Sequence, residues 1–139
     1  MSTPYAGLSP VQAAIYDVLV ADEDLSEMVV GVFDGEAPEG TPRPYILIGD
    51  AFEVPDNAHG VFGRQTVTTL HVWSDYRGWR EATAIVDRVC ALLDHQPLTI
   101  PGHQHIVTRF EFSQTLIDAD RPDLRHVPVR FRILTSREA

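Results

Sequence analysis

The segment from Trp79 to Leu93 constrains the possible folds of this chain more than any other part of it. Its apolar residues recur at alternating steps of three and four, which places them on one face of an α-helix of about 18 residues. That face consists of Trp79, Ala82, Val86, Val89 and Leu93, widened by Ile85, Cys90 and Leu92. Ser74 or Asp75 is expected to cap the helix, and Pro97 to end it. A helix with one apolar face has to cover another element, which the neighbouring segments predict to be a sheet.

Four extended segments provide that sheet. Gln65–Trp73 alternates between two faces, whereas Tyr45–Asp50 is apolar on both and is expected to be central or covered twice. The last two long strands are His105–Leu116 and His126–Leu134. Because Pro128 has no N–H to donate to a neighbour, the final strand is expected at an edge of the sheet, at least at that point.

Alternation within the last two strands predicts which side chains share a face. In the first of them, one side is expected to hold Ile106, Phe110 and Phe112, and the other Arg109, Glu111 and Ser113. In the second, the inward side holds Val127, Val129, Phe131 and Ile133, and the outward side His126, Arg130 and Arg132.

The remaining segments complete the order of the elements. A first helix is expected from Leu8 to Val20, followed by a short extended piece at residues 28–33. Residues 34–44 and 52–64 hold the prolines and glycines typical of loops, and loops of such length usually bind something or become ordered by a neighbour. The order helix, strand, strand, helix, strand, strand predicts an α+β fold. This is an antiparallel sheet of about four long strands with two helices packed on one face, within a single domain of residues 1–139.

The net charge argues against one class of function. The chain has 11 arginines, no lysine and 20 acidic residues, for a net charge of −9. An acidic protein lacks the basic patch that grips phosphate backbones, so DNA is not expected to be bound specifically. The charge is also uneven, since residues 1–60 carry −10 and residues 61–139 carry +1. An acidic part and a nearly neutral, arginine-bearing part can attract one another between copies, which indicates association.

Cysteine content and apolar runs limit the compartment and the chemistry. Cys90 is the only cysteine, so no intrachain disulfide can form, and its place on the helical stripe indicates a core residue rather than a nucleophile. The N-terminal residues lack the basic region and apolar run of a signal peptide, and no segment has the roughly 18 apolar residues of a membrane span. We therefore expect neither a disulfide-stapled fold nor a membrane partner.

Histidines provide the basis for an enzymatic alternative. His103 and His105 have the spacing that places two imidazoles on one side of a strand, where Asp56 or His59 could complete a metal site. His71 could act as a general base, although the sequence places no nucleophile or carboxylate beside it. This interpretation describes a small ligand-binding or metal-dependent enzyme domain. The sequence holds no phosphate-binding glycine loop, cysteine pair or nucleophile elbow, so no cofactor is implied.

Arginines on the C-terminal strands predict a different kind of site. If these strands pair side by side, Arg109, Arg130 and Arg132 form a basic stripe, and arginine is favoured at protein interfaces because its planar fork pairs with carboxylates. The expected counterparts on another copy are acidic residues of segment 34–56, namely Glu36, Glu39, Asp50 and Glu53. A contact between two different surfaces closes into a ring or continues as a filament. Two alternatives remain open: solvated strand faces, and a monomeric adaptor that adds a partner's strand at the Pro128 edge.

Three passages of the chain resemble one known family. They are Pro44-Tyr-Ile-Leu-Ile-Gly-Asp, then Thr66-Val-Thr-Thr-Leu-His-Val-Trp-Ser followed at once by the Trp79–Leu93 helix, and the ending from Asp118 through Leu124-Arg-His-Val-Pro-Val-Arg-Phe-Arg-Ile. In these passages the chain resembles the tail-completion family of long-tailed bacteriophages, the tail-terminator or tail-to-head joining proteins. The similarity spans about Leu8 to Thr135. The His103 and His105 pair and segment 52–64 lie outside the pattern.

The resemblance implies a structural protein of the virion rather than an enzyme. Members of the family are small α+β proteins that assemble as rings, usually hexamers, at the head-proximal end of the tail tube. They cap the finished tube and provide the docking face for the head connector. The implied partners are therefore further copies of the chain, the tail-tube protein and the head connector protein. DNA is expected to pass through the ring without specific binding, assembly to take place in the host cytoplasm, and no catalytic residue or cofactor to be needed.

Overall fold

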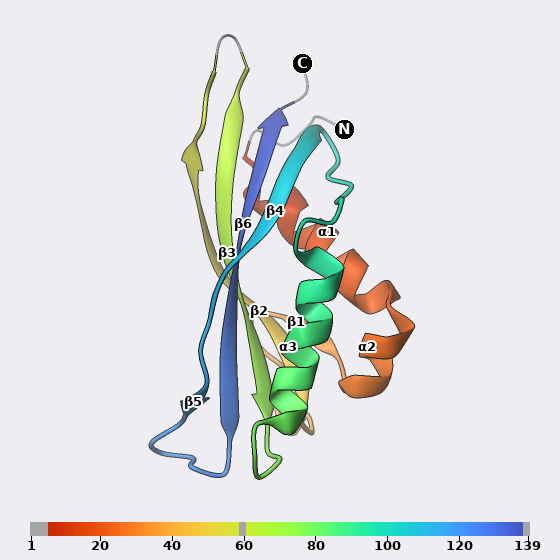
Figure 1. The fold of residues 1–139 in the computed structure, drawn as a ribbon, viewed down its shortest axis with the longest axis vertical. Coiled ribbons are helices and arrows are strands. Elements are labelled where there is room, and N and C mark those ends of the chain that lie inside the picture. Colours follow the sequence, from red (N-terminus) through yellow and green to blue (C-terminus); the bar gives the residue numbers. More distant parts are fainter. Residues whose placement is uncertain (1–5, 59–60, 138–139) are drawn as a thin grey trace.

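The computed structural model describes residues 6–58 and 61–137 (Figure 1). Its helices are α1 (Leu8–Ala21), α2 (Glu23–Met28) and α3 (Arg80–Leu93). Its strands are β1 (Val32–Asp34), β2 (Tyr45–Pro55), β3 (Gly63–Ser74), β4 (His103–Ser113), β5 (Leu116–Ile117) and β6 (Arg125–Arg137). None of the helices in these ranges combines the length and the apolar character that a membrane crossing requires.

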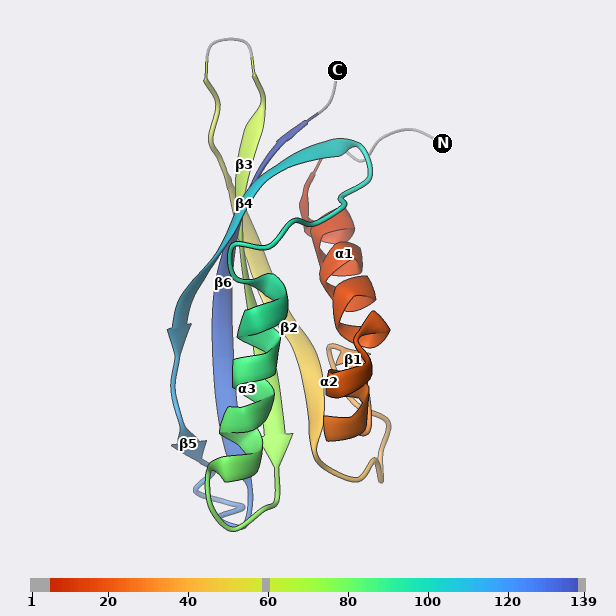
Figure 2. The same cartoon turned by 45° about the vertical axis from the view of Figure 1, so that its right-hand side comes forward.

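The strands form one mixed sheet in the order β1-β2-β3-β6-β4, and β5 pairs with the start of β6. The long strands β2, β3, β6 and β4 are antiparallel neighbours, as predicted, while the short β1 runs parallel to β2. All three helices lie on the same side of the sheet (Figure 2). The α+β class is therefore confirmed, and α2 is a third helix beyond the two that were expected.

β6 is not an edge strand over its length, because it lies between β3 and β4, and the expectation applies only at Pro128 itself. Pro128 is accommodated by an interruption in the neighbouring chain. Its carbonyl oxygen accepts a hydrogen bond from the Gln114 N–H at 3.3 Å, so its nitrogen also faces the gap between β4 and β5. A missing N–H costs little where the neighbouring strand is broken, and a proline is therefore tolerated inside this sheet.

The loop expected at residues 52–64 is also wrong at both of its ends. β2 continues to Pro55 and β3 begins at Gly63, so the two strands form a long hairpin that projects beyond the other strands (Figure 1). Position 63 requires glycine, because a Cβ there would collide with the backbone of Asp56. The Asp56 N–H donates to the carbonyl of Gly63 at 2.9 Å. The glycine that indicated a loop instead permits close pairing of two strands.

α3 begins later than predicted. Its first residue is Arg80, and the capping position is occupied by Trp79 without a side-chain hydrogen bond. Ser74 stabilises the preceding turn instead, because its hydroxyl accepts from the Tyr76 N–H at 3.1 Å and donates to Glu81 at 2.7 Å. The predicted stripe is otherwise buried against the sheet as expected, at Ala82, Ile85, Val86, Val89 and Leu93.

The core lies between the helices and the inner face of the sheet. α1 contributes Val11, Ala14, Ile15 and Leu19. The sheet contributes Ile46, Ile48, Leu70, Val72, Val127, Val129, Phe131 and Ile133, which confirms the predicted inward face of the last strand. Burial of each large apolar side chain stabilises the fold by about 1.5–3 kcal/mol relative to exposure.

One ion pair fixes the helices relative to one another. The Asp22 carboxylate caps α2 by accepting the Leu25 N–H at 2.8 Å, and it receives two hydrogen bonds from Arg88 of α3, at 2.8 and 2.6 Å. The hydrogen-bonded Arg88 guanidinium is the main reason why the pKa of Asp22 falls to about 2. The same carboxylate therefore caps one helix and ties it to another.

Replacement of this arginine by Arg88→Gln is expected to move the pKa of Asp22 back toward its ordinary value of 3.8. Because the native pKa is depressed, the stabilisation is present above the ordinary value and is lost as the pH falls toward about 2. Denaturant unfolding at a series of pH values should show wild type more stable than the variant at neutral pH, with the difference shrinking in acid. A difference that stayed constant down to a pH of about 2 would contradict this role.

Candidate assembly interface

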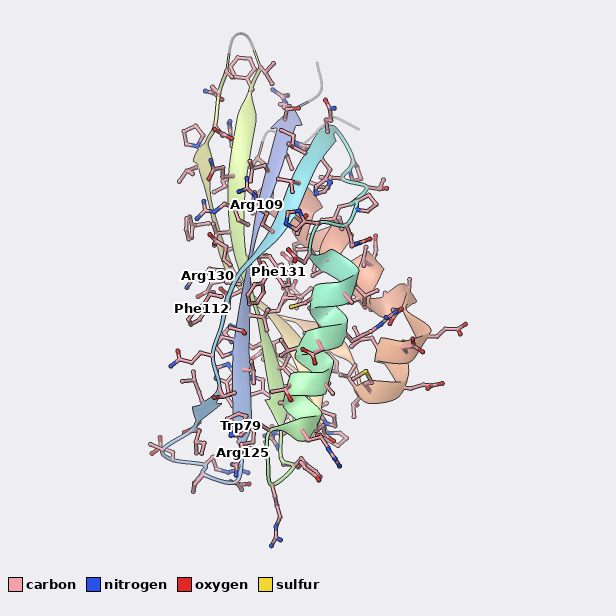
Figure 3. The ribbon with its side chains drawn as sticks, viewed as in Figure 1. Trp79, Arg109, Phe112, Arg125, Arg130 and Phe131 are labelled. Carbon is pink, nitrogen blue, oxygen red and sulfur yellow. The ribbon has the colours of Figure 1, made fainter. Side chains whose placement is uncertain are left out.

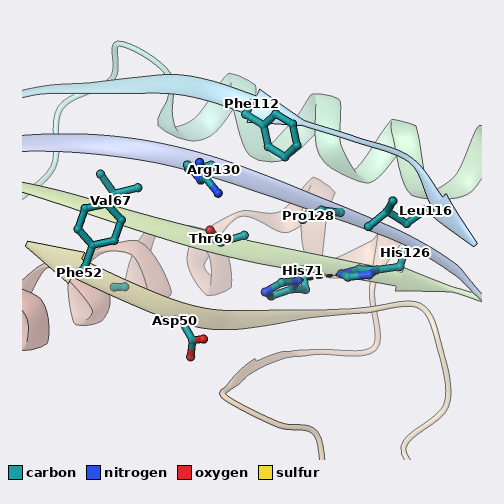
Figure 4. A pocket seen from close by; sticks show the side chains of 11 residues that line it. Asp50, Phe52, Val67, Thr69, His71, Phe112, Leu116, His126, Pro128 and Arg130 are labelled. Atoms are coloured by element: carbon teal, nitrogen blue, oxygen red, sulfur yellow. Dashed lines mark hydrogen bonds between the residues drawn. The ribbon is translucent and has the colours of Figure 1, made fainter. Parts of the chain in front are cut away.

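The helices leave one face of the sheet uncovered by the described parts of the chain (Figure 2). An open groove of about 790 Å³ runs over this face across β2, β3, β6 and the end of β4. We call it the open-face groove, and Figure 4 shows the side chains that line it: Asp50, Ala51, Phe52, Val67, Thr69, His71, Phe112, Leu116, His126, Pro128 and Arg130.

The apolar part of the groove depends on an irregularity in β4. The pairing of β4 with β6 shifts between Phe110 and Phe112, so these two side chains turn to opposite sides. Phe110 meets the buried Phe131 edge-on at 6.1 Å, on the helix side, whereas Phe112 lines the groove. The prediction that Phe110 and Phe112 share a face is therefore wrong, because a β-bulge changes the alternation. A second shift lies between His105 and Val107, and it leaves Ile106 58% exposed.

The three predicted arginines do come together on this face. Arg109 and Arg132 are direct partners across β4 and β6, and Arg130 lies two residues further along (Figure 3). Arg132 donates hydrogen bonds to the Glu111 carboxylate at 2.9 Å and to the side-chain amide oxygen Oε1 of Gln65 at 2.7 Å.

The side chains of the other two arginines have fewer contacts within the fold. Arg130 lies over the ring of Phe112 at 5.4 Å. Within the described ranges the Arg109 side chain makes no hydrogen bond or ion pair. Arg109 and Arg130 are therefore the side chains of this stripe with hydrogen-bonding capacity left for a partner.

The structure does not gather the four predicted acidic residues into one surface. Glu36 and Glu39 are exposed in the segment between β1 and β2, whereas Asp50 lies at the β2 margin of the groove itself. Glu53 is on the helix side of the sheet, where it accepts the Gly7 N–H at 2.8 Å. This carboxylate stabilises the positive end of the α1 dipole.

A pair of histidines closes one end of the groove. His71 Nδ1 and His126 Nε2 share a hydrogen bond of 2.8 Å (Figure 4). The His126 ring also stacks on Trp73 at 4.1 Å between centroids. Burial, followed by the neighbouring His71, lowers the pKa of His126 from 6.5 to about 4. Burial also lowers the pKa of His71, against an opposing effect of Asp50. The sequence singled out His71 but not His126, whose proximity depends on the register of β3 with β6.

His103 and His105, the two histidines proposed to bind a metal, make contacts within the fold. His105 bonds the Thr108 hydroxyl at 2.7 Å and the Leu98 N–H at 3.4 Å, and His103 is buried. Among residues 6–58 and 61–137, no group of three or more potential ligands could hold a metal ion. His59 lies outside the described residues. Cys90 packs against the core, and burial raises its pKa to about 11, so the thiol stays protonated at neutral pH.

Aromatic, aliphatic and arginine side chains on an uncovered sheet face have the composition of a surface that contacts another protein. The fold and this surface thus define a protein suited to assembly. The family described as "Tail completion protein gp17" matches residues 13–136, and the chain belongs to this family. It is a structural phage tail protein and not an enzyme, and the metal-dependent alternative built on His71, His103 and His105 is set aside.

Individual relatives agree with this assignment. The tail completion protein gp17 of Bacillus phage SPP1 is 29% identical over 110 residues, which cover 79% of this chain and 81% of that protein. The solved structure of bacteriophage SPP1 gp17 has a TM-score of 0.65 at 26% identity, covering 96% of this chain and 95% of that one. A chain from the virion of a native gene transfer agent particle has the same fold, with a TM-score of 0.86 at 22% identity, covering 96% and 99%.

Gly49, at the irregularity of β2 beside the groove, is expected to tolerate no side chain. A Cβ there would lie 2.5 Å from His71 Nε2 and 2.8 Å from the Thr69 carbonyl oxygen. Gly49→Ala should therefore destabilise the protein by about 1–3 kcal/mol, as overpacking does. Chemical denaturation measures this loss. The matched control is Gly78→Ala, whose Cβ would meet nothing closer than 4.0 Å, and equal stability of the two variants would contradict the packing described.

The histidine pair predicts a pH dependence of stability. Because the native pKa of His126 lies below 6.5, the unfolded chain takes up the proton first, and stability falls as the pH drops from 6.5 toward about 4. His126→Phe keeps an aromatic ring against Trp73 and removes the titrating group, so its stability should depend less on pH in this window. Urea unfolding across the window checks this. An identical pH profile for both proteins would show that His126 makes no such contribution.

Proposed function

We propose that this protein completes the tail of a long-tailed phage or prophage particle by forming a ring of its own copies at the head-proximal end of the tail tube. Family membership over residues 13–136 is the observation that carries the proposal. The ring is most simply a hexamer, and it joins the tube to the head connector protein. The protein is then part of the virion, after assembly in the host cytoplasm. It acts by surface complementarity, without a cofactor.

The surfaces of the chain support assembly by contact between copies. The open-face groove offers apolar side chains together with Arg130, and Arg109 lies outside the groove on the same face. The net charge of residues 1–60, in contrast, is −10. Two different surfaces of complementary charge favour a head-to-tail contact, and such contacts close into rings when the rotation between copies is right.

The acidic character of the protein supports its role as a conduit. A net charge of −9 per copy disfavours adhesion of phosphate groups, so DNA can pass the ring without being held. The partners that remain in contact are proteins: neighbouring copies, the tail-tube protein and the head connector.

The monomeric adaptor has less support. Its predicted docking edge does not exist, because β6 is internal. The edge that β4 does present is occupied at its centre, where the His95 N–H donates to the Thr108 carbonyl at 2.7 Å and the Phe110 N–H donates to Asp94 at 2.8 Å. Strand addition by a partner would have to displace both bonds.

Light scattering and electron microscopy of the purified protein test the proposal, alone and with tail-tube protein. We expect closed rings that weaken at high salt, since screening reduces attraction between charged surfaces. Arg109→Glu with Arg130→Glu should weaken assembly, whereas Arg80→Glu on α3 makes the same kind of charge change on the helix side and should not. Arg132 is left intact because Glu111 holds it within the fold. A protein that stayed monomeric under every condition, including with tail-tube protein, would contradict the proposal.

A further inference from the structure

α1 is apolar on two sides, although it lies at the surface. Its inner side packs Val11, Ile15 and Leu19 into the core. A second stripe at helical spacing faces outward, formed by Ala13, Tyr16, Asp17 and Val20. Tyr16 is 40% exposed and Val20 43%, so an aromatic and an aliphatic side chain lie in solvent next to one another on the helix.

The other long helix shows that this is a particular property of α1. The exposed positions of α3 are Arg80, Thr83, Ala84, Asp87 and Ala91, none of which is a large apolar residue. A surface helix ordinarily carries polar residues on its outer side, as α3 does. Clustered large apolar residues on an outer side mark a contact with another molecule.

Charge indicates what that molecule presents. No basic residue occurs before Arg43, and the exposed side of α1 and α2 carries Asp17, Glu23, Asp24 and Glu27. The outer surface of α1 is therefore apolar and acidic. The open-face groove is apolar, with Phe52 55% and Phe112 39% exposed. Asp50 lies at its β2 margin, whereas Arg130 lines it on β6 and Arg109 lies further along the same face on β4. The side of this face formed by β4 and β6 therefore complements α1 in its apolar character and in its charge.

The two surfaces lie on opposite sides of the sheet, so a single copy cannot bring them together (Figure 2). Contact between them requires two copies. Each copy then contacts one neighbour through α1 and another neighbour through its open-face groove. This geometry excludes a two-fold dimer through these surfaces and produces a directional chain of copies.

We infer that the outer stripe of α1 in one copy docks into the open-face groove of the next copy. Tyr16 and Val20 pack against Phe52 and Phe112, and Asp17 pairs with Arg130. This inference rests on the proposed ring and assigns the surfaces that build it.

Cysteine cross-linking tests the contact in a Cys90→Ala background. A chain with both Tyr16→Cys and Phe112→Cys should give a ladder of dimers and larger species with a short bifunctional maleimide. Either variant alone should give no cross-link, and a mixture of the two should stop at the dimer, because each chain then carries one half of the contact. Thr83→Cys replaces Tyr16→Cys in the control. It lies at an exposed position of the same helix layer, and it should not cross-link to Phe112→Cys.

Charge reversal tests the pairing independently. Arg130→Glu should weaken self-association about tenfold or more, and adding Asp17→Arg should restore it, as expected for a close charge pair across an interface. Both positions are at the surface, and unfolding curves of the variants verify that the fold is intact.

The outcomes separate this inference from the proposed function. Rings in the electron microscope without the ladder and without charge rescue would overturn the docking and leave the ring. Cross-linking of Phe112→Cys to the tail-tube protein in place of a second copy would also overturn it. Absence of any oligomer, with or without tail-tube protein, would contradict both.

Discussion

The antiparallel pairing of β3 with β6 is the interaction on which the rest of the structure depends. It runs from Gly63 opposite Ser136 to Ser74 opposite Arg125, at the centre of the sheet. Its register sends Leu70 and Val129 toward the helices, and His71 and Arg130 to the open face. A slip of one residue would exchange the two faces and lose both the core and the groove together.

Regular patterns in the sequence predicted the parts of the fold that follow them. The apolar stripe of α3 and the alternation of β6 are both periodic over many residues, and both are confirmed. The predictions were wrong at residues, such as a proline or a glycine, that are compatible with two different local structures. Pro128 indicated an edge but faces a break between β4 and β5, and Gly63 indicated a loop but permits tight pairing of a hairpin. Sequence periodicity does not distinguish these cases, because the deciding neighbour is distant along the chain.

The part of the candidate site that follows regular strand alternation was predictable from the sequence. Arg109, Arg130 and Arg132 share a face because β4 and β6 pair in register at that point. Phe112 joins them only through a β-bulge, and His126 meets His71 only through the register of β3 with β6. The second apolar stripe of α1, formed by Ala13, Tyr16 and Val20, was not predicted. It acquires meaning once the structure shows that α1 has another side already buried. The open face of the sheet and the outer stripe of α1 are the two surfaces of the proposed contact.

Electron cryo-microscopy of tails assembled with this protein tests the central claim most directly. We expect one closed ring of copies at a single end of the tube, with the helices of each copy against the open sheet face of its neighbour. A single copy per tail, or copies distributed along the tube, would contradict it.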